Sequence, residues 1–295
     1  MNIESFVSKE FGEDELAYLK KIRTGGDNNS KGGQYELYFA VAKICEIAAN
    51  EADHNDFEIS RQEYGFVDDL TVRCLSKAKK KNYQLKNSSN SAANWDDDVN
   101  FRFDLQHRID SNFYQCPDNK QVLVVSCPKK DKANQLKIPS NLKGIGFSEF
   151  FPYKLNLFEQ INETENLKNN FKEICDSTEL QVADYAFRLI LAALISNSSR
   201  MSVAGILESA NRMGRPGIFR MSADQDTIPE WLDQKCRAFQ DVTVSVESGH
   251  FIVNYNNLRV TIGKDISEPS IQVLDGLTTL REFIHYLMST AISEL

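Results

Sequence analysis

The spacing of apolar and polar positions over residues 30–130 predicts a mixed α/β unit. Apolar side chains recur at helical spacing over residues 34–50 and again over 98–114, so we expect a helix in each segment. The uninterrupted apolar run 122–126 is typical of a strand that is buried on both faces. Short β-rich segments stand between the two helices, and they span residues 57–60, 70–72 and 82–87.

The predicted order of elements is therefore helix, three strands, helix, strand. The three consecutive strands have mostly short connections, one of which is the lysine-rich stretch 76–81, and this favours a β-meander. The second helix and the last strand would form a right-handed crossover beside that meander. We expect a fold of the α/β (α+β) class.

The second half of the chain is predicted to be mostly helical, with a small β-hairpin or meander. The polar stretch 128–146 is typical of a loop or boundary, so we divide the chain into a domain of residues 1–137 and a domain of residues 138–295. Helices are expected over residues 155–175, 179–195, 202–213, 228–239 and 277–292. Alternating segments separated by tight turns predict strands over residues 242–246, 251–255 and 258–262.

Helices followed by a hairpin suit two interpretations of the second half. One is a winged helix-turn-helix, in which Arg212, Arg215 and Arg220 would contact phosphates. The other is an α+β module for protein contacts or assembly. The larger share of the acidic excess of the chain lies in this half, which favours the second interpretation.

Composition and charge narrow the class of protein. The 295 residues are 41% hydrophobic and 26% charged, which is ordinary globular composition. No apolar stretch approaches the roughly 18 residues of a membrane helix, and we expect neither a membrane segment nor a signal peptide. Six scattered cysteines without a C-x-x-C pair favour reduced thiols and a cytoplasmic location. The net charge of −8 argues against a surface coated with phosphate-binding residues, although a nucleic-acid enzyme can confine positive charge to one groove.

Four side chains that could bind a metal ion, a phosphate or an attacking water are expected at one end of the predicted meander. Gln84 and Lys86 are two positions apart on one strand, so they share a face. Hairpin pairing would bring Asp69, at the start of the preceding strand, close to that face. Glu36 lies on the apolar line of the helix over 34–50, which directs its carboxylate toward the core. Carboxylate and amide oxygens suit Mg²⁺, and a lysine beside them suits a phosphate or an attacking water.

This pattern resembles the PD-(D/E)XK, or restriction-endonuclease-like, superfamily. The segments that carry the resemblance are residues 32–36 (GGQYE), 67–72 (VDDLTV) and 83–88 (YQLKNS). The Gln in the last segment is similar to the Q-x-K subgroup found in nuclease modules of bacterial anti-phage defence effectors and in Mrr-like enzymes. The resemblance covers about residues 30–130 and implies that family's αβββαβ core.

The resemblance also implies an activity. It implies a metal-dependent endonuclease that hydrolyses phosphodiester bonds, with DNA favoured as substrate, in an anti-phage defence or restriction system. Glu36, Asp69 and Gln84 would hold Mg²⁺, with Mn²⁺ as the alternative, and Lys86 would orient or deprotonate the attacking water or brace the phosphate. An ATPase or sensor partner and a homo-oligomer are expected. The alternative is a catalytically inactive scaffold that binds nucleic acid or a partner protein.

A lysine cluster is the candidate nucleic-acid contact. Its members stand in the predicted hairpin connection and are Lys77, Lys79, Lys80 and Lys81. Such clusters most often form a solvated loop that prevents strand pairing at a sheet edge, and in a nuclease they would also contact phosphates.

Overall fold

The computed structural model describes most of the chain. The described residues are 2–25, 30–88, 90–175, 177–196, 200–214, 218–219, 228–247, 250–256, 258–263, 266 and 268–293. Within them, no helix is long and apolar enough to cross a membrane. All six cysteines lie in this part of the chain, and each is a free thiol.

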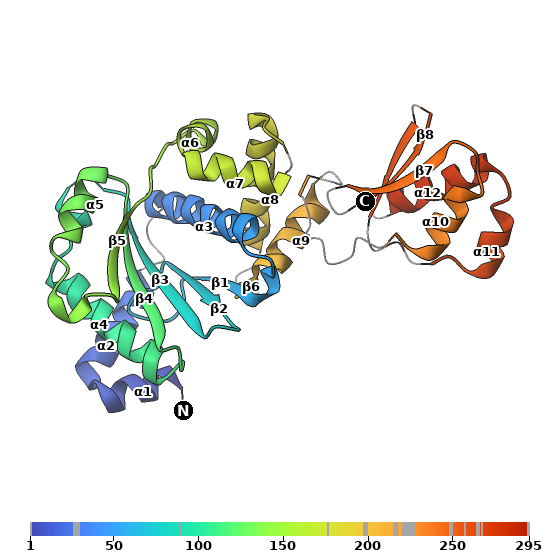
Figure 1. Ribbon diagram of the computed structural model, residues 1–295. Coiled ribbons are helices and arrows are strands. Elements are labelled where there is room, and N and C mark those ends of the chain that lie inside the picture. The colour runs from blue at the N-terminus through green and yellow to red at the C-terminus, as the bar shows by residue number, and fades with distance from the viewer. Residues whose placement is uncertain are drawn as a thin grey trace.

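Six strands of the described residues form one mixed sheet in the order β5-β4-β3-β2-β1-β6 (Figure 1). The strands are β1 (Phe57–Arg61), β2 (Leu70–Cys74), β3 (Lys79–Lys86), β4 (Asp118–Val125), β5 (Gly146–Phe150) and β6 (Met201–Ser202). Strands β1, β2 and β3 form an antiparallel meander, and β4 lies parallel to β3. The helices that precede and follow the meander are α3 (Ser30–Asn50) and α4 (Asp97–Asn112). The mixed α/β class and the predicted order of these six elements are therefore confirmed.

Helices α3 and α4 cover opposite faces of the sheet, because the side chains of a strand alternate between faces. On β4, Val122 and Val124 pack in the core that contains α3, whereas Leu123 and Val125 pack in the core that contains Phe103 of α4. The strand is thus buried on both faces, as its apolar run predicts. The first helices, α1 (Ile3–Glu10) and α2 (Glu13–Gly25), form a further small core with α4.

The predicted loop over 128–146 is wrong, and so is the domain boundary at residue 137. Residues 128–146 contain helix α5 (Pro128–Gln135), which begins with proline at a position where that residue is favourable. The Asn134 side chain of α5 is buried and accepts a hydrogen bond from the backbone N–H of Trp95, so this polar residue belongs to the interior of the protein. After α5, strand β5 joins the free edge of β4 in parallel. The sheet therefore extends across the predicted boundary.

Four more helices belong to the apolar core that contains α3. They are α6 (Leu157–Glu163), α7 (Glu165–Cys175), α8 (Leu180–Ser196) and α9 (Val203–Met213). Their apolar side chains join the cluster that contains α3, and α7 and α8 contact α3 directly (Figure 1). The helix predicted over 155–175 is divided, because Thr164 leaves the helical conformation between α6 and α7. Strand β6, immediately before α9, pairs with β1.

The last part of the chain builds a smaller sheet with its own apolar core. Its described elements are α10 (Glu230–Arg237), β7 (Val242–Glu247), β8 (His250–Tyr255), β9 (Leu258–Ile262), α11 (Ile271–Gly276) and α12 (Leu280–Ser293). The three strands form an antiparallel meander, as predicted. Arg212 lies on α9, which packs in the first core and not in this one, whereas Arg215 and Arg220 lie outside the described residues. The winged-helix interpretation gains no support from the helix that carries Arg212.

Candidate active site

Asp69 and Gln84 lie side by side at the end of the sheet where β2 begins and β3 ends. Leu70 pairs with Tyr83 in the antiparallel register, which sets Asp69 opposite Gln84. The Gln84 Nε2 donates a hydrogen bond to Asp69 Oδ2, and the backbone N–H of Leu85 donates to the same oxygen at 2.6 Å. Both side chains are buried. The juxtaposition predicted from hairpin pairing is therefore present.

Glu36 and Lys86 complete the predicted set at the same end of the sheet. Burial, followed by the negative charge of Asp69, raises the pKa of Glu36 to about 7, and the charges of Arg61 and Lys86 oppose this rise. These electrostatic influences show that α3 brings Glu36 close to the strand residues. Gln62 Nε2 also donates a 3.1 Å hydrogen bond to Glu36 Oε2. The fold thus assembles four residues from three separate segments of the chain.

The carboxylates of the site repel one another. Burial raises the pKa of Asp69, and burial followed by the charge of Asp69 raises the pKa of Asp68 to about 7. Arg102 opposes the rise for Asp68, with its Nη2 3.4 Å from Asp68 Oδ1. Neighbouring carboxylates that are taken out of water favour either a proton or a bound cation. The donor set therefore suits a hard cation such as Mg²⁺.

Three further residues of the site lie outside the three segments that carry the family resemblance. Gln62 follows β1 with a φ of 51° and stands opposite Asp69, which places its amide beside Glu36. Arg61 is partly buried next to Glu36, and its Nε finds no hydrogen-bond partner among the described residues. Arg102, on α4, donates through Nη2 to Gln84 Oε1 at 2.6 Å. Only the tertiary fold brings these three side chains to the motif residues.

Helix α4 also holds the segment that leads into Asp69. Arg102 Nε donates to the carbonyl of Phe66 at 2.7 Å, and Gln106 Oε1 accepts from the N–H of Phe66 at 2.7 Å. Gly65 is required for this approach, because a Cβ at that position would lie 2.5 Å from Gln106 Oε1. Arg102 and Gln106 are four residues apart and therefore lie on one face of the helix. That spacing is the one sequence signal that points to them.

The predicted lysine cluster does not lie at this site. Lys79 pairs with Cys74, so the lysines occupy the end of β3 that is opposite to Gln84 and Lys86. Lys80 is 1% exposed and forms an ion pair with buried Asp110, so its prediction as a nucleic-acid contact is wrong. Strand alternation explains this result, because Lys80 faces α4, whereas Lys79 and Lys81 are exposed.

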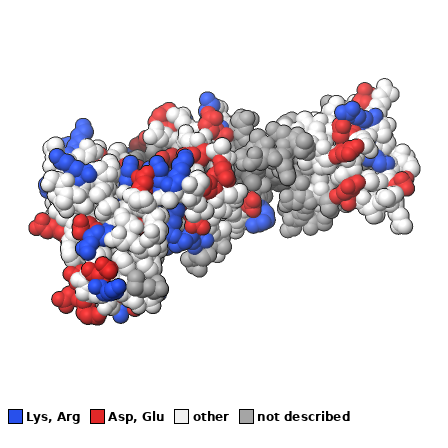
Figure 2. All heavy atoms as spheres, turned by 60° about the horizontal axis from the view of Figure 1, so that its bottom comes forward, with Lys and Arg blue, Asp and Glu red and all other residues white. Residues whose placement is uncertain are grey.

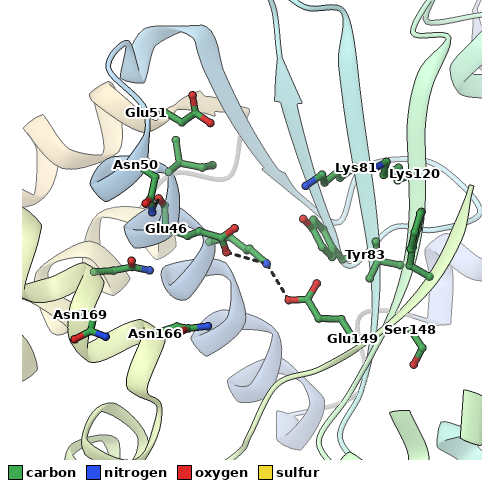
Figure 3. A pocket seen from close by; sticks show the side chains of 15 residues that line it. Glu46, Asn50, Glu51, Lys81, Tyr83, Lys120, Ser148, Glu149, Asn166 and Asn169 are labelled. Atoms are coloured by element: carbon green, nitrogen blue, oxygen red, sulfur yellow. Dashed lines mark hydrogen bonds and ion pairs between the residues drawn. The ribbon is translucent and has the colours of Figure 1, made fainter. Parts of the chain in front are cut away.

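A polar groove of about 750 Å³ opens at this opposite end, between α3, α7 and strands β3 to β5 (Figure 3). Lys81 and Lys120 point toward it from the strands, while Asn166 and Asn169 line it from α7. Lys43, which also lines it, is paired with both Glu46 and Glu149 at 2.9 Å. On the face of the molecule shown in Figure 2, basic side chains are interspersed with acidic ones. The groove is therefore of mixed charge and separate from the candidate active site.

Comparisons with other proteins do not assign the chain to a family. No protein-family model, curated protein or solved structure matches it significantly. Within the described residues, no group of three or more His, Cys, Asp or Glu side chains is arranged to hold a metal ion. The predicted donor set differs from such a group, because it comprises two carboxylates and one amide. The geometry around Asp69 is therefore the main indication of function.

Proposed function

We propose that the protein is a metal-dependent nuclease of the PD-(D/E)XK type, with DNA as the favoured substrate. The observation that carries this proposal is the convergence of Asp69, Gln84, Lys86 and Glu36 at one end of the sheet. Its context supports the same conclusion, since α3, the meander, α4 and parallel β4 follow the αβββαβ order that the sequence resemblance implies.

Glu36 and Asp69 are the residues that would hold the cation. Burial raises the pKa of both carboxyl groups, and the charge of Asp69 adds to the rise for Glu36, so a bound Mg²⁺ or Mn²⁺ would relieve this unfavourable arrangement. The cation would supply charge stabilisation for the pentavalent phosphate and would acidify a water molecule. The hydrogen bond from Leu85 N and the opposing position of Gln62 hold Asp69 in place, so that its geometry does not depend on the ligand.

Lys86 and Arg61 supply the positive charge of the site. Lys86 is partly exposed and follows Gln84 by two positions on β3, so it shares a face of the sheet with Gln84, and its charge acts on both Glu36 and Asp69. It would donate a hydrogen bond to a phosphate oxygen or hold the attacking water. The buried Nε of Arg61 lacks a partner among the described residues and provides a second donor beside Glu36.

A plasmid-cleavage assay tests the proposal. Purified full-length protein is incubated with supercoiled DNA in Mg²⁺, in Mn²⁺ and in excess chelator, together with the Lys86→Ala variant, and single-stranded RNA is offered in parallel. Cleavage that requires the metal and is lost in Lys86→Ala supports the proposal. Absence of metal-dependent cleavage of either nucleic acid, or equal cleavage by wild type and Lys86→Ala, overturns it and favours the non-catalytic scaffold.

A further inference from the structure

The two ends of the Gln84 amide have chemically different partners. Its Oε1 accepts a 2.6 Å hydrogen bond from Arg102 Nη2, and its Nε2 donates to Asp69 Oδ2. A guanidinium group can only donate, and an ionised carboxylate can only accept. The orientation of the amide is therefore determined by its neighbours, with nitrogen toward Asp69 and oxygen toward α4.

We propose that Gln84 is a positioning residue that orients Asp69 through its N–H, and that it is not an oxygen ligand of the metal. This inference rests on the proposed nuclease function. To present Oε1 to a cation beside Asp69, the amide would have to turn over and break both hydrogen bonds. It would then direct its N–H₂ group toward Arg102, which also has only donors. The metal ligands are therefore Glu36 and Asp69, without Gln84.

Arg102 is fixed independently of Gln84, which makes it a stable anchor. Its Nε bonds the carbonyl of Phe66, and its guanidinium also lies next to Asp68. Its side chain is only 12% exposed, so water competes weakly for these bonds. The hydrogen bonds from Arg102 to Gln84 and from Gln84 to Asp69 thus connect α4, β3 and the beginning of β2.

The same geometry explains why this position carries Gln. A glutamate would accept from Arg102 but would have no proton for Asp69 Oδ2, and it would place a second negative charge beside that buried carboxylate. The N–H of Leu85 already donates to Asp69 Oδ2 at 2.6 Å. Gln84 supplies the second donor to this oxygen, and together they fix the plane of the carboxylate.

Enzyme kinetics distinguish a positioning residue from a ligand. Gln84→Glu keeps an oxygen and loses the donor, whereas Gln84→Met loses both. A positioning role predicts that both variants lose at least about tenfold in kcat, since each removes a hydrogen bond to a charged group. Arg102→Lys, which preserves charge and not the forked geometry, is expected to show a similar loss. Combining it with Gln84→Met should lower kcat by less than the product of the two single effects, because part of the effect of Arg102 passes through Gln84 and part through its own bond to the Phe66 carbonyl.

A crystal structure of Lys86→Ala soaked with Mn²⁺ supplies a readout besides activity, since anomalous scattering locates the ion. The expected result is an ion within about 2.5 Å of carboxylate oxygens of Glu36 and Asp69, with Gln84 Oε1 still bonded to Arg102. An ion coordinated by Gln84 Oε1, or a Gln84→Glu variant as active as wild type, overturns the positioning role and leaves the nuclease proposal intact. An ion absent from Glu36 and Asp69, in a wild-type protein that does not cleave, overturns both proposals.

Discussion

Lys80 donates a 2.6 Å hydrogen bond to Asp110, and both side chains are excluded from solvent between β3 and α4. Gln106 donates to the same carboxylate oxygen, while Asn82 and Gln121 donate to the other. Asp110 is thus a buried charge with a donor for each of its acceptor positions. The network also reaches the candidate active site, because Gln106 holds the backbone of Phe66.

Replacing Lys80 by Ala is expected to lower the free energy of unfolding by about 3–5 kcal/mol, because it leaves the Asp110 carboxylate buried without its cation. Urea denaturation followed by circular dichroism measures the change. Lys79→Ala is the matched control on the same strand, since its partner Asp118 is exposed and its loss should be barely detectable. A Lys80→Ala variant as stable as Lys79→Ala would contradict the buried ion pair.

Lys86→Ala is expected to reduce DNA cleavage by roughly a hundredfold or more, because the site loses the ammonium group that faces the phosphate or the attacking water. The midpoint of thermal unfolding should change little, since Lys86 is partly exposed and no hydrogen bond or ion pair of its side chain is seen in the described residues. Lys9→Ala, which removes an exposed lysine of α1 outside the lysine cluster, is the control and should cleave at nearly the wild-type rate. Equal losses in the two variants would point to a general electrostatic effect.

Glu36 should make the metal-free protein less stable as the pH rises. Its pKa is about 7 in the folded state against 4.5 for an ordinary Glu, so the folded state binds the proton more tightly. The stabilising effect of protonation is complete below about pH 4.5 and is lost as the pH passes through 7. The groups that act on Glu36 are Asp69, Arg61, Gln62 and Lys86.

Glu36→Gln removes this titration. In chelator, the variant is expected to be more stable than wild type at pH 8 and nearly equal to it at pH 4.5, while metal-dependent cleavage is lost. Thermal unfolding across this pH range measures the difference between the two proteins. A difference that stays constant from pH 4.5 to 8 would show that the carboxyl of Glu36 is not protonated preferentially in the folded state.

Mg²⁺ should stabilise the wild-type protein and leave Asp69→Asn unaffected. A ligand that binds only the folded state adds about 2.7 kcal/mol at a hundred times its Kd, and the thermal midpoint rises accordingly. Asn at position 69 keeps an oxygen that can accept from Leu85 N, so the fold is preserved while one anionic ligand is lost. Asp118→Asn, an exposed acid at the far end of β4, should respond to Mg²⁺ like wild type. A full response in Asp69→Asn would place the metal elsewhere.

Local periodicity determined most of the helices and strands, and it also determined that Asp69 lies opposite Gln84. Side-chain spacing predicts helices α3 and α4 and the strands of the meander, because that spacing decides which face of an element can be buried. The contact between Asp69 and Gln84 also follows, because an antiparallel hairpin aligns residues near the beginning of one strand with residues near the end of the next. Both inferences depend only on side-chain spacing within one element or on the pairing of two strands that are consecutive along the chain.

The remaining features depend on contacts between distant segments, and the sequence by itself did not determine them. Whether Lys80 is solvated or buried depends on Asp110, 30 positions away, and the orientation of the Gln84 amide depends on Arg102, 18 positions away. The polar stretch 128–146 contains helix α5 and leads into strand β5, which gives the backbone groups at the edge of β4 their partners. A charged or polar side chain has the same local pattern in a loop and in a paired interior position, so only the tertiary structure decides between them.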